Sequence, residues 1–135
     1  MGGRRVTELL VDTHVLIWAM ADPQKLTSAA DAALADPDTV VWVSAASAWE
    51  IATKVRIGKL AGAESLVLDY AQHLERWYAT PLPLDSADSL LAGSIAWDHR
   101  DPFDRMIVAQ AIRRGLPLVS ADKVFDGLRG VERIW

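Results

Sequence analysis

The feature that most constrains this chain is the alternation of short apolar segments with longer segments of helical pattern. Short apolar segments rich in β-branched or aromatic residues predict buried strands, and the period of the intervening segments predicts helices. Strands separated by helices form right-handed βαβ units, which place the strands in a parallel sheet covered on both faces. The predicted strands are 8–12 (ELLVD), 40–43 (VVWV), 80–84 (TPLPL), 116–119 (LPLV) and 132–135 (ERIW).

Helix start and stop signals lie between these strands. Thr27 suits the cap of one helix, Ser44 or Ser47 the cap of another, and Gly58 and Gly115 suit helix ends. The two prolines of 80–84 lack a donor N–H group, which restricts that strand to a sheet edge. The predicted helices are 14–20, 27–34, 44–57, 64–78, 86–97 and 104–114.

The composition limits the class of protein. The 135 residues contain no repeat or linker and suit a single domain over 1–135, with residues 1–7 expected to form a flexible N-terminal segment. No apolar run is long enough to cross a bilayer, no secretory signal is evident and cysteine is absent, so a cytoplasmic protein is expected. A net charge of −4 argues against a passive nucleic-acid binder. It is compatible with an enzyme whose acids hold divalent cations.

The segment HRDPFDRMIVAQAIRRG (99–115) contains two acids with different expected roles. Asp101 can cap the following helix, with Pro102 at its first position. Asp104 falls in the first turn of the same helix, where the helix dipole stabilises a negative charge. It also lies on the apolar stripe of that helix. An ionised carboxylate that faces the core is costly unless a cation or several donors meet it. Asp104 is therefore the suspected functional acid of the pair. The other members of its stripe are Ile107, Val108, Ala111 and Ile112.

Three further acids follow strand ends or lie in the helix after a strand, where ligands gather in parallel sheets. Each also has a structural explanation: Asp12 and Asp122 can cap helices, and Glu50 can pair with Lys54 at i, i+4. An acid cluster would repel itself without a cation, and ligation by oxygen alone suits Mg²⁺ or Mn²⁺, which commonly accompany phosphate substrates. The three histidines are expected to be structural or surface residues.

Four stretches of the sequence carry a family resemblance. LLVDTHVLIWAM (9–20), SAASAWEIATKVRIGKL (44–60), HRDPFDRMIVAQA (99–111) and LPLVSADKVF (116–125) resemble the four conserved blocks of PIN-domain ribonucleases. They resemble most closely the VapC-type toxins of bacterial toxin–antitoxin pairs. The resemblance implies a three-layer α/β/α sandwich with a central, mainly parallel sheet. It also implies a metal-dependent endoribonuclease, the toxin of a type II toxin–antitoxin system, that leaves a 5′-phosphate and a 3′-hydroxyl.

The resemblance also assigns roles by position. Asp12, Glu50, Asp104 and Asp122 would be the catalytic acids and the ligands of Mg²⁺ or Mn²⁺, with Asp12 and Asp104 as the main inner-sphere ligands. Ser120 would brace the site, with Thr13 and Asp101 as further supporting residues. Near the acids, Lys54 and Arg105 are candidate RNA contacts, with salt bridges as the alternative. The implied partners are an RNA substrate, a VapB-like antitoxin and a second copy of the chain in a homodimer.

Two other classes stay open at this point. A catalytically silent PIN-like binding module would use the acids only as caps. A receiver-type signalling domain shares the size and the acid pocket, but it needs a phospho-accepting aspartate after a middle strand. Here VVWV leads into Ser-Ala-Ala-Ser instead. A dehalogenase-like phosphatase would need an Asp-x-Asp motif, whereas the first predicted strand ends in Asp12-Thr13-His14.

Overall fold

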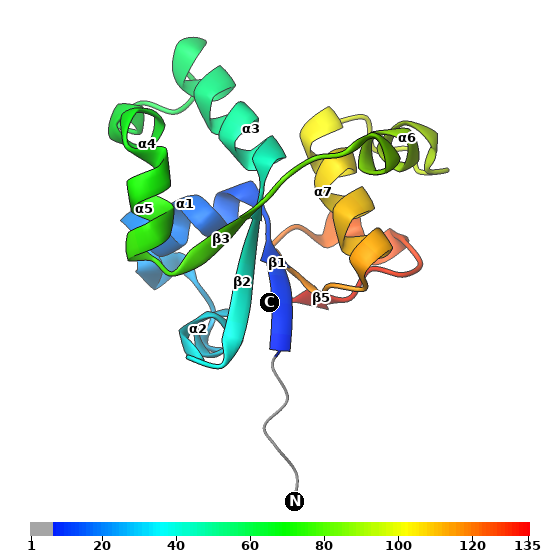
Figure 1. Cartoon of the computed structure of the whole chain (residues 1–135), viewed down its shortest axis with the longest axis horizontal. Coiled ribbons are helices and arrows are strands. Elements are labelled where there is room, and N and C mark those ends of the chain that lie inside the picture. Colours follow the sequence, from blue (N-terminus) through cyan, green and yellow to red (C-terminus); the bar gives the residue numbers. More distant parts are fainter. Residues whose placement is uncertain (1–6) are drawn as a thin grey trace, which may run out of the picture.

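The computed structural model describes residues 7–135. The expected flexible segment 1–7 lies outside the described residues except for Thr7, which begins the first strand. Five strands form one sheet in the order β3-β2-β1-β4-β5, and every neighbouring pair is parallel (Figure 1). The sheet confirms the predicted architecture, with the proline-containing strand at an edge. The strands are β1 (Thr7–Val11), β2 (Thr39–Ser44), β3 (Ala79–Leu82), β4 (Leu118–Val119) and β5 (Arg133–Ile134).

Helices cover both faces of the sheet. Figure 1 shows α1, α2, α4 and α5 on one side and α6 and α7 on the other, with α3 extending from the end of β2. Within residues 7–135, none of the helices has the length and apolar character needed to cross a membrane. The helices are α1 (Thr13–Ala21), α2 (Ser28–Ala35), α3 (Ala45–Arg56), α4 (Glu64–Leu68), α5 (Tyr70–Arg76), α6 (Ser86–Ser94) and α7 (Pro102–Arg114), with 3₁₀ turns η1 (Pro23–Lys25) and η2 (Lys123–Gly127).

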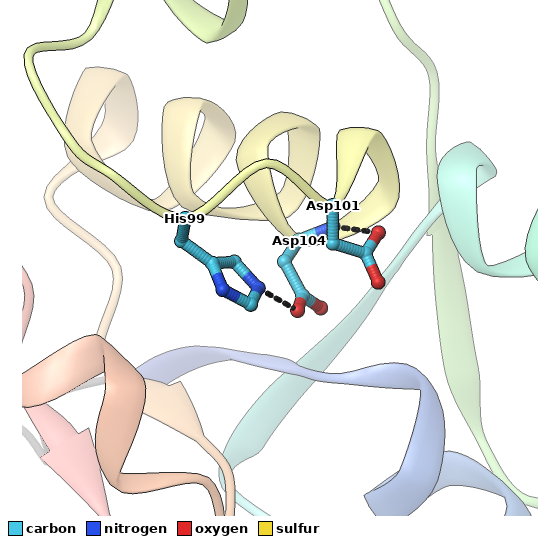
Figure 2. Close-up of side chains that lie close together, drawn as sticks. All are labelled: His99, Asp101 and Asp104. Atoms are coloured by element: carbon cyan, nitrogen blue, oxygen red, sulfur yellow. Dashed lines mark hydrogen bonds and ion pairs between the residues drawn. The ribbon is translucent and has the colours of Figure 1, made fainter.

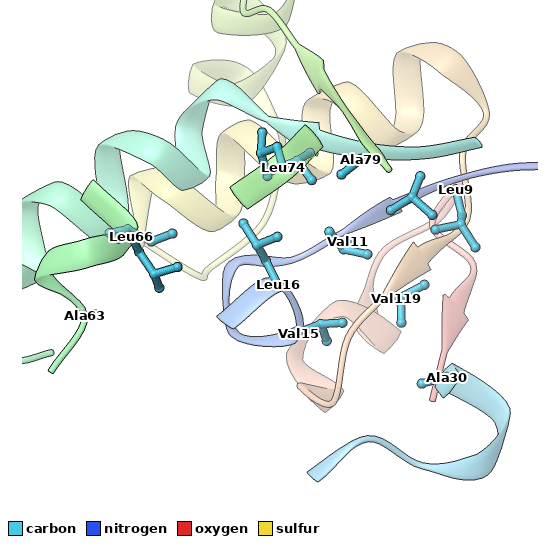
Figure 3. Packing of buried hydrophobic residues seen from close by; sticks show 13 residues of the cluster. Leu9, Val11, Val15, Leu16, Ala30, Ala63, Leu66, Leu74, Ala79 and Val119 are labelled. Atoms are coloured by element: carbon cyan, nitrogen blue, oxygen red, sulfur yellow. The ribbon is translucent and has the colours of Figure 1, made fainter. Parts of the chain in front are cut away.

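The central strand β1 supplies side chains to two cores because successive residues of a strand face opposite sides of the sheet. Leu9 and Val11 pack with residues of α1, α4 and α5 on one face (Figure 3). Leu10 packs on the other face with residues of α7. Full burial of one such side chain stabilises the fold by about 1.5–3 kcal/mol. The position of β1, and of the residue that follows it, is therefore strongly determined.

Helix termini match the sequence signals. Thr27 caps α2, Ser44 caps α3, and the Asp101 carboxylate accepts hydrogen bonds from the backbone N–H groups of Phe103 and Asp104 at the start of α7. Gly115 ends α7 in the left-handed region at φ +63°, a conformation that glycine adopts without strain. The local chemistry of α7 therefore fixes where its first turn begins.

Two predicted helices differ from the structure. The segment 64–78 forms two short helices, α4 and α5, separated at Asp69, and both direct a leucine (Leu66 and Leu74) into the same core. The helix expected over 86–97 ends at Ser94. Beyond that point the chain is irregular up to α7, and the guanidinium of Arg105 donates to the carbonyls of Ile95, Trp97 and His99 in this loop and of Ala92 in α6.

Candidate metal centre

Asp12 lies at the point in the sheet where strand order reverses, between β1 and β4. Its backbone N–H donates to the Val119 carbonyl of β4, and its side chain accepts from the Val15 N–H at 2.8 Å, which caps α1. The Ser120 hydroxyl, at the end of β4, donates a short hydrogen bond to the other carboxylate oxygen. Asp12 is only 5% exposed. Burial raises the pKa of Asp12 despite these hydrogen bonds, and the charge of Glu50 raises it further.

Glu50 projects from α3 and is 2% exposed. Its Oε2 atom pairs with Lys54 Nζ at 2.5 Å, which confirms the expected i, i+4 ion pair. Its Oε1 atom is buried and has no hydrogen-bond partner within the part of the chain that the structure describes. A buried carboxylate oxygen without a donor is costly and uncommon in folded proteins. A cation at this oxygen would remove that cost.

Asp104 lies in the first turn of α7 beside two other possible ligands. Its Oδ2 atom is 2.7 Å from His99 Nε2, and His99, Asp101 and Asp104 each offer one ligand atom within 4.8 Å of the others (Figure 2). Burial, together with the charges of Asp101 and Glu50, raises the pKa of Asp104 to about 6, although the hydrogen bond with His99 lowers it. His99 therefore lies closer to the acids than the sequence suggested. Nothing in its local sequence pattern indicates this, because the residue lies in an irregular loop.

Asp12, Glu50 and Asp104 form one electrostatic cluster drawn from three separate elements. The negative charge of Glu50 acts on both aspartates and raises the pKa of each. Because the charge of Glu50 opposes the ionisation of both aspartates in a largely buried site, a positive charge is needed for all three carboxylates to be ionised together. Oxygen ligands of this kind suit a hard divalent cation. The cluster can therefore hold a divalent metal ion.

Three hydroxyl residues form hydrogen bonds around these acids. Ser120 bridges Asp12 and the fourth predicted acid, because its hydroxyl donates to Asp12 and accepts from the Asp122 backbone N–H at 3.0 Å. Thr13 and Ser47 share a buried 3.0 Å hydrogen bond that joins α1 to α3. This contact connects the helix that follows Asp12 to the helix that carries Glu50. These hydrogen bonds are compatible with the supporting roles predicted for Ser120 and Thr13.

Asp122 is placed differently from the other three acids. Its carboxylate accepts from the Val124 N–H at 3.0 Å and caps η2, as its capping interpretation predicted. Its connection to the cluster runs through its own backbone N–H and the Ser120 hydroxyl. The charge of Glu50 therefore acts on both Asp12 and Asp104, whereas Asp122 connects to Asp12 through the Ser120 hydroxyl.

Arg105 has a structural role that its sequence position does not reveal. Its guanidinium donates four hydrogen bonds, at 2.7–2.9 Å, to four backbone carbonyls of the α6–α7 connection. Most of its donors are thereby used within the chain. These bonds hold the loop that carries His99 in place, and they leave Arg105 few donors for the phosphate contact predicted for it.

Comparisons with known proteins agree with the fold. The family model described as "PIN domain" matches residues 9–131. Ribonuclease VapC22 of Mycobacterium tuberculosis (strain ATCC 25618 / H37Rv) is 33% identical over 121 residues, which cover 87% of this chain and 89% of that protein. Among solved structures, VapBC2 from Rickettsia felis, bound to a promoter DNA fragment, has a TM-score of 0.68 at 13% identity and covers 94% of this chain and 97% of that chain.

A second solved structure, DNA-bound VapBC from Salmonella typhimurium, has a TM-score of 0.69 at 16% identity, with 94% of this chain and 96% of that chain covered. At these identities the two structures show a shared fold. The family model and the relative from Mycobacterium tuberculosis extend over most of the chain and confirm the resemblance found in the four sequence blocks. The chain therefore belongs to the PIN domain family and is related within it to the VapC-type ribonucleases.

Proposed function

We propose that this chain is a metal-dependent endoribonuclease, the toxin component of a type II toxin–antitoxin pair, which hydrolyses RNA phosphodiester bonds. One observation supports the proposal above the others. The carboxylates of Asp12 and Glu50 are buried and that of Asp104 is half-buried, the charge of Glu50 acts on both aspartates, and one Glu50 oxygen is buried without a hydrogen-bond partner among the residues that the structure describes. That arrangement is costly for a protein that uses its acids only as helix caps.

Asp12 and Asp104 would be the direct ligands of Mg²⁺ or Mn²⁺. Glu50 would contribute its unpaired Oε1 atom, and Asp122 would act through water or at a second ion. When bound, the metal ion acidifies a water molecule, orients it towards the phosphate and offsets the charge that builds on the phosphate oxygens. The expected products are a 5′-phosphate and a 3′-hydroxyl.

The chain's own residues keep the ligands in place for this chemistry. Val15 and Ser120 each donate to one oxygen of Asp12, so the orientation of that carboxylate is fixed before any ion binds. His99 does the same for one oxygen of Asp104. Lys54 holds Glu50 through one oxygen, and its partly exposed ammonium is our remaining candidate for a phosphate contact. Pre-oriented ligands avoid reorganisation at the moment of reaction.

The proposed partners are an antitoxin of the VapB type and a second copy of the chain. The VapBC names of the structural neighbours and the family membership support an antitoxin. An acidic cluster without sufficient internal cations also suits a basic side chain inserted by such a partner. We propose that the pair acts in the cytoplasm.

The test is RNA cleavage by the purified chain, with Mg²⁺, with Mn²⁺ and with EDTA. Wild type is compared with Asp104→Asn, which keeps the size of the side chain. The matched control is Asp98→Asn, which changes an exposed acid of the loop before α7. We expect metal-dependent cleavage by wild type and the control, and a loss of at least about 100-fold in Asp104→Asn, as is common when a group that stabilises developing charge is removed. Equal cleavage by Asp104→Asn would refute the metal assignment, and a chain that cleaves no RNA with either metal would support the silent binding module.

A further inference from the structure

An aromatic pair lies beside the acids and has no role in the chemistry described so far. Trp49 precedes Glu50 on α3, and Phe103 precedes Asp104 on α7. The two rings meet edge to face, with centroids 4.6 Å apart and an interplanar angle of 74°. The same two helices therefore present two acids and, one residue earlier on each, two aromatic rings in contact.

The position of the pair relative to the acids follows from helix geometry. Successive residues of a helix project about 100° apart, so each ring lies to the side of its neighbouring acid and does not cover it. Because the rings of Trp49 and Phe103 touch each other, both lie on the same side of the acid cluster. They form an aromatic wall next to the site.

Trp49 is exposed to an unusual degree for this residue type. It is 54% exposed, whereas tryptophan is highly buried on average in folded proteins. Large exposed aromatic rings beside a functional site commonly mark a binding surface. The ring is held by Phe103 and not by the core, so it keeps accessible surface available for a planar ligand.

The charges of the chain give a reason for an RNA-cleaving enzyme to need such a surface. The net charge is −4, so general attraction for phosphates is weak. Several cations are also engaged internally: Lys54 by Glu50, Arg105 by backbone carbonyls, Arg113 and Arg114 by Asp88, and Arg133 by Asp126. Stacking of bases on aromatic rings supplies affinity for single strands that does not depend on charge.

We propose that Trp49, supported by Phe103, forms a nucleobase subsite in which a base adjacent to the scissile phosphate of single-stranded RNA stacks on the indole ring. This inference rests on the proposed ribonuclease function and adds a binding role for Trp49, which would hold one base next to the cut. Stacking tolerates any base, so Trp49 confers affinity and register rather than a strict sequence preference.

The experiment measures coupling between Trp49 and one base. A short single-stranded RNA that wild type cleaves is synthesised with a single abasic nucleotide at each position around the cut. Kinetics of each substrate are measured for wild type, Trp49→Ala, Trp49→Phe and Leu90→Ala, whose exposed leucine on α6 serves as the control. We expect Trp49→Ala to raise KM about tenfold or more, the size of one lost stacking contact, with a much smaller effect on kcat. Trp49→Phe should keep most of the affinity and Leu90→Ala all of it.

The abasic series separates stacking from other roles of the tryptophan. At one position next to the cut, the abasic substitution should raise the KM of wild type by about the same factor as Trp49→Ala does. It should raise the KM of Trp49→Ala little further. If the two losses multiply at every position, no base stacks on Trp49 and the inference is wrong. A uniform fall in kcat would instead assign Trp49 to positioning Asp104, and a change confined to oligomeric state or antitoxin binding would assign it to a protein interface. Either result overturns the subsite.

Failure of the proposed function is a separate outcome. If wild type cleaves no RNA with Mg²⁺ or Mn²⁺, the ribonuclease assignment fails and the nucleobase subsite fails with it. If wild type cleaves and only the coupling is absent, the subsite alone is refuted.

Discussion

Replacing Asp104 with asparagine should stabilise the metal-free protein while it removes activity. The side chain is only 20% exposed, and burial with two neighbouring acids raises its pKa from 3.8 to about 6. A shift of that size corresponds to roughly 3 kcal/mol of unfavourable free energy for the ionised form in the folded state, at about 1.36 kcal/mol per pH unit. Asparagine forgoes a favourable charge at the helix N-terminus, worth about 0.3–1 kcal/mol. The expected net gain is about 2 kcal/mol in the free energy of unfolding.

The gain should depend on pH in a defined direction. Because the folded-state pKa of Asp104 is above its ordinary value, the folded protein binds more protons than the unfolded chain between about pH 4 and pH 6. The stability of wild type therefore falls as pH rises through that window, and this contribution to the slope is absent from Asp104→Asn. The difference between the two proteins should be near zero at about pH 4 and fully developed above about pH 7.

Urea unfolding in EDTA at these two pH values measures the difference directly, with Asp98→Asn as the exposed control. Adding Mg²⁺ or Mn²⁺ at neutral pH should then stabilise wild type more than Asp104→Asn, because an ion that binds only the folded state raises its stability by mass action. A difference that is the same at both pH values would show that ionisation of Asp104 is not its cause. An equal response of both proteins to metal would show that Asp104 is not a ligand.

Three further substitutions test the frame around the site. Lys54→Met leaves the buried carboxylate of Glu50 without its ion pair and should lower the free energy of unfolding, measured with urea in EDTA, by about 2 kcal/mol. Mn²⁺ should partly restore this stability, and an unchanged free energy of unfolding would mean that the pair contributes little. Arg105→Lys cannot bond four carbonyls with one ammonium and should cost about 3 kcal/mol by the same measurement, whereas a cost below about 1 kcal/mol would contradict the role of Arg105 in the loop. Burial alone would raise the pKa of Asp88, but hydrogen bonds from Arg114 and Arg113 outweigh it and lower that pKa. Asp88→Asn should therefore cost about 2–4 kcal/mol at pH 7 and progressively less as the pH falls below about 4, and a cost independent of pH would contradict the ion-pair account.

Local patterns in the sequence were sufficient to predict much of the fold. Short continuous apolar segments located the strands, and capping residues located the starts of α2, α3 and α7. The carboxyl-end rule for parallel sheets also points to Asp12 as a candidate site residue. These features are predictable because the interactions that determine them lie within a few residues of one another along the chain.

The features that sequence reasoning missed depend on long-range contacts. The end of α6 at Ser94 is set by Arg105, eleven positions later, through carbonyl groups that no residue pattern specifies. The proximity of His99 to Asp104 depends on the path of an irregular loop. The separation of α4 from α5 depends on directing two leucines into one core. In each case several backbone conformations are compatible with the local sequence, and tertiary packing decides between them.

The placement of these acids is compatible with helix capping and with the proposed metal ligation at the same time. A carboxylate has two oxygens, and Asp12 uses one for the first turn of α1 while the other meets Ser120 at the switch point of the sheet. Asp101 caps α7 within reach of a shared ion. Asp104 differs, because in the part of the chain that the structure describes its carboxylate caps nothing and is bonded by His99 alone. The charge of Asp104 stabilises the fold little beyond its interaction with the helix dipole, and burying that charge is costly. Of these acids, Asp104 is therefore the one whose replacement should most clearly raise stability while it removes activity.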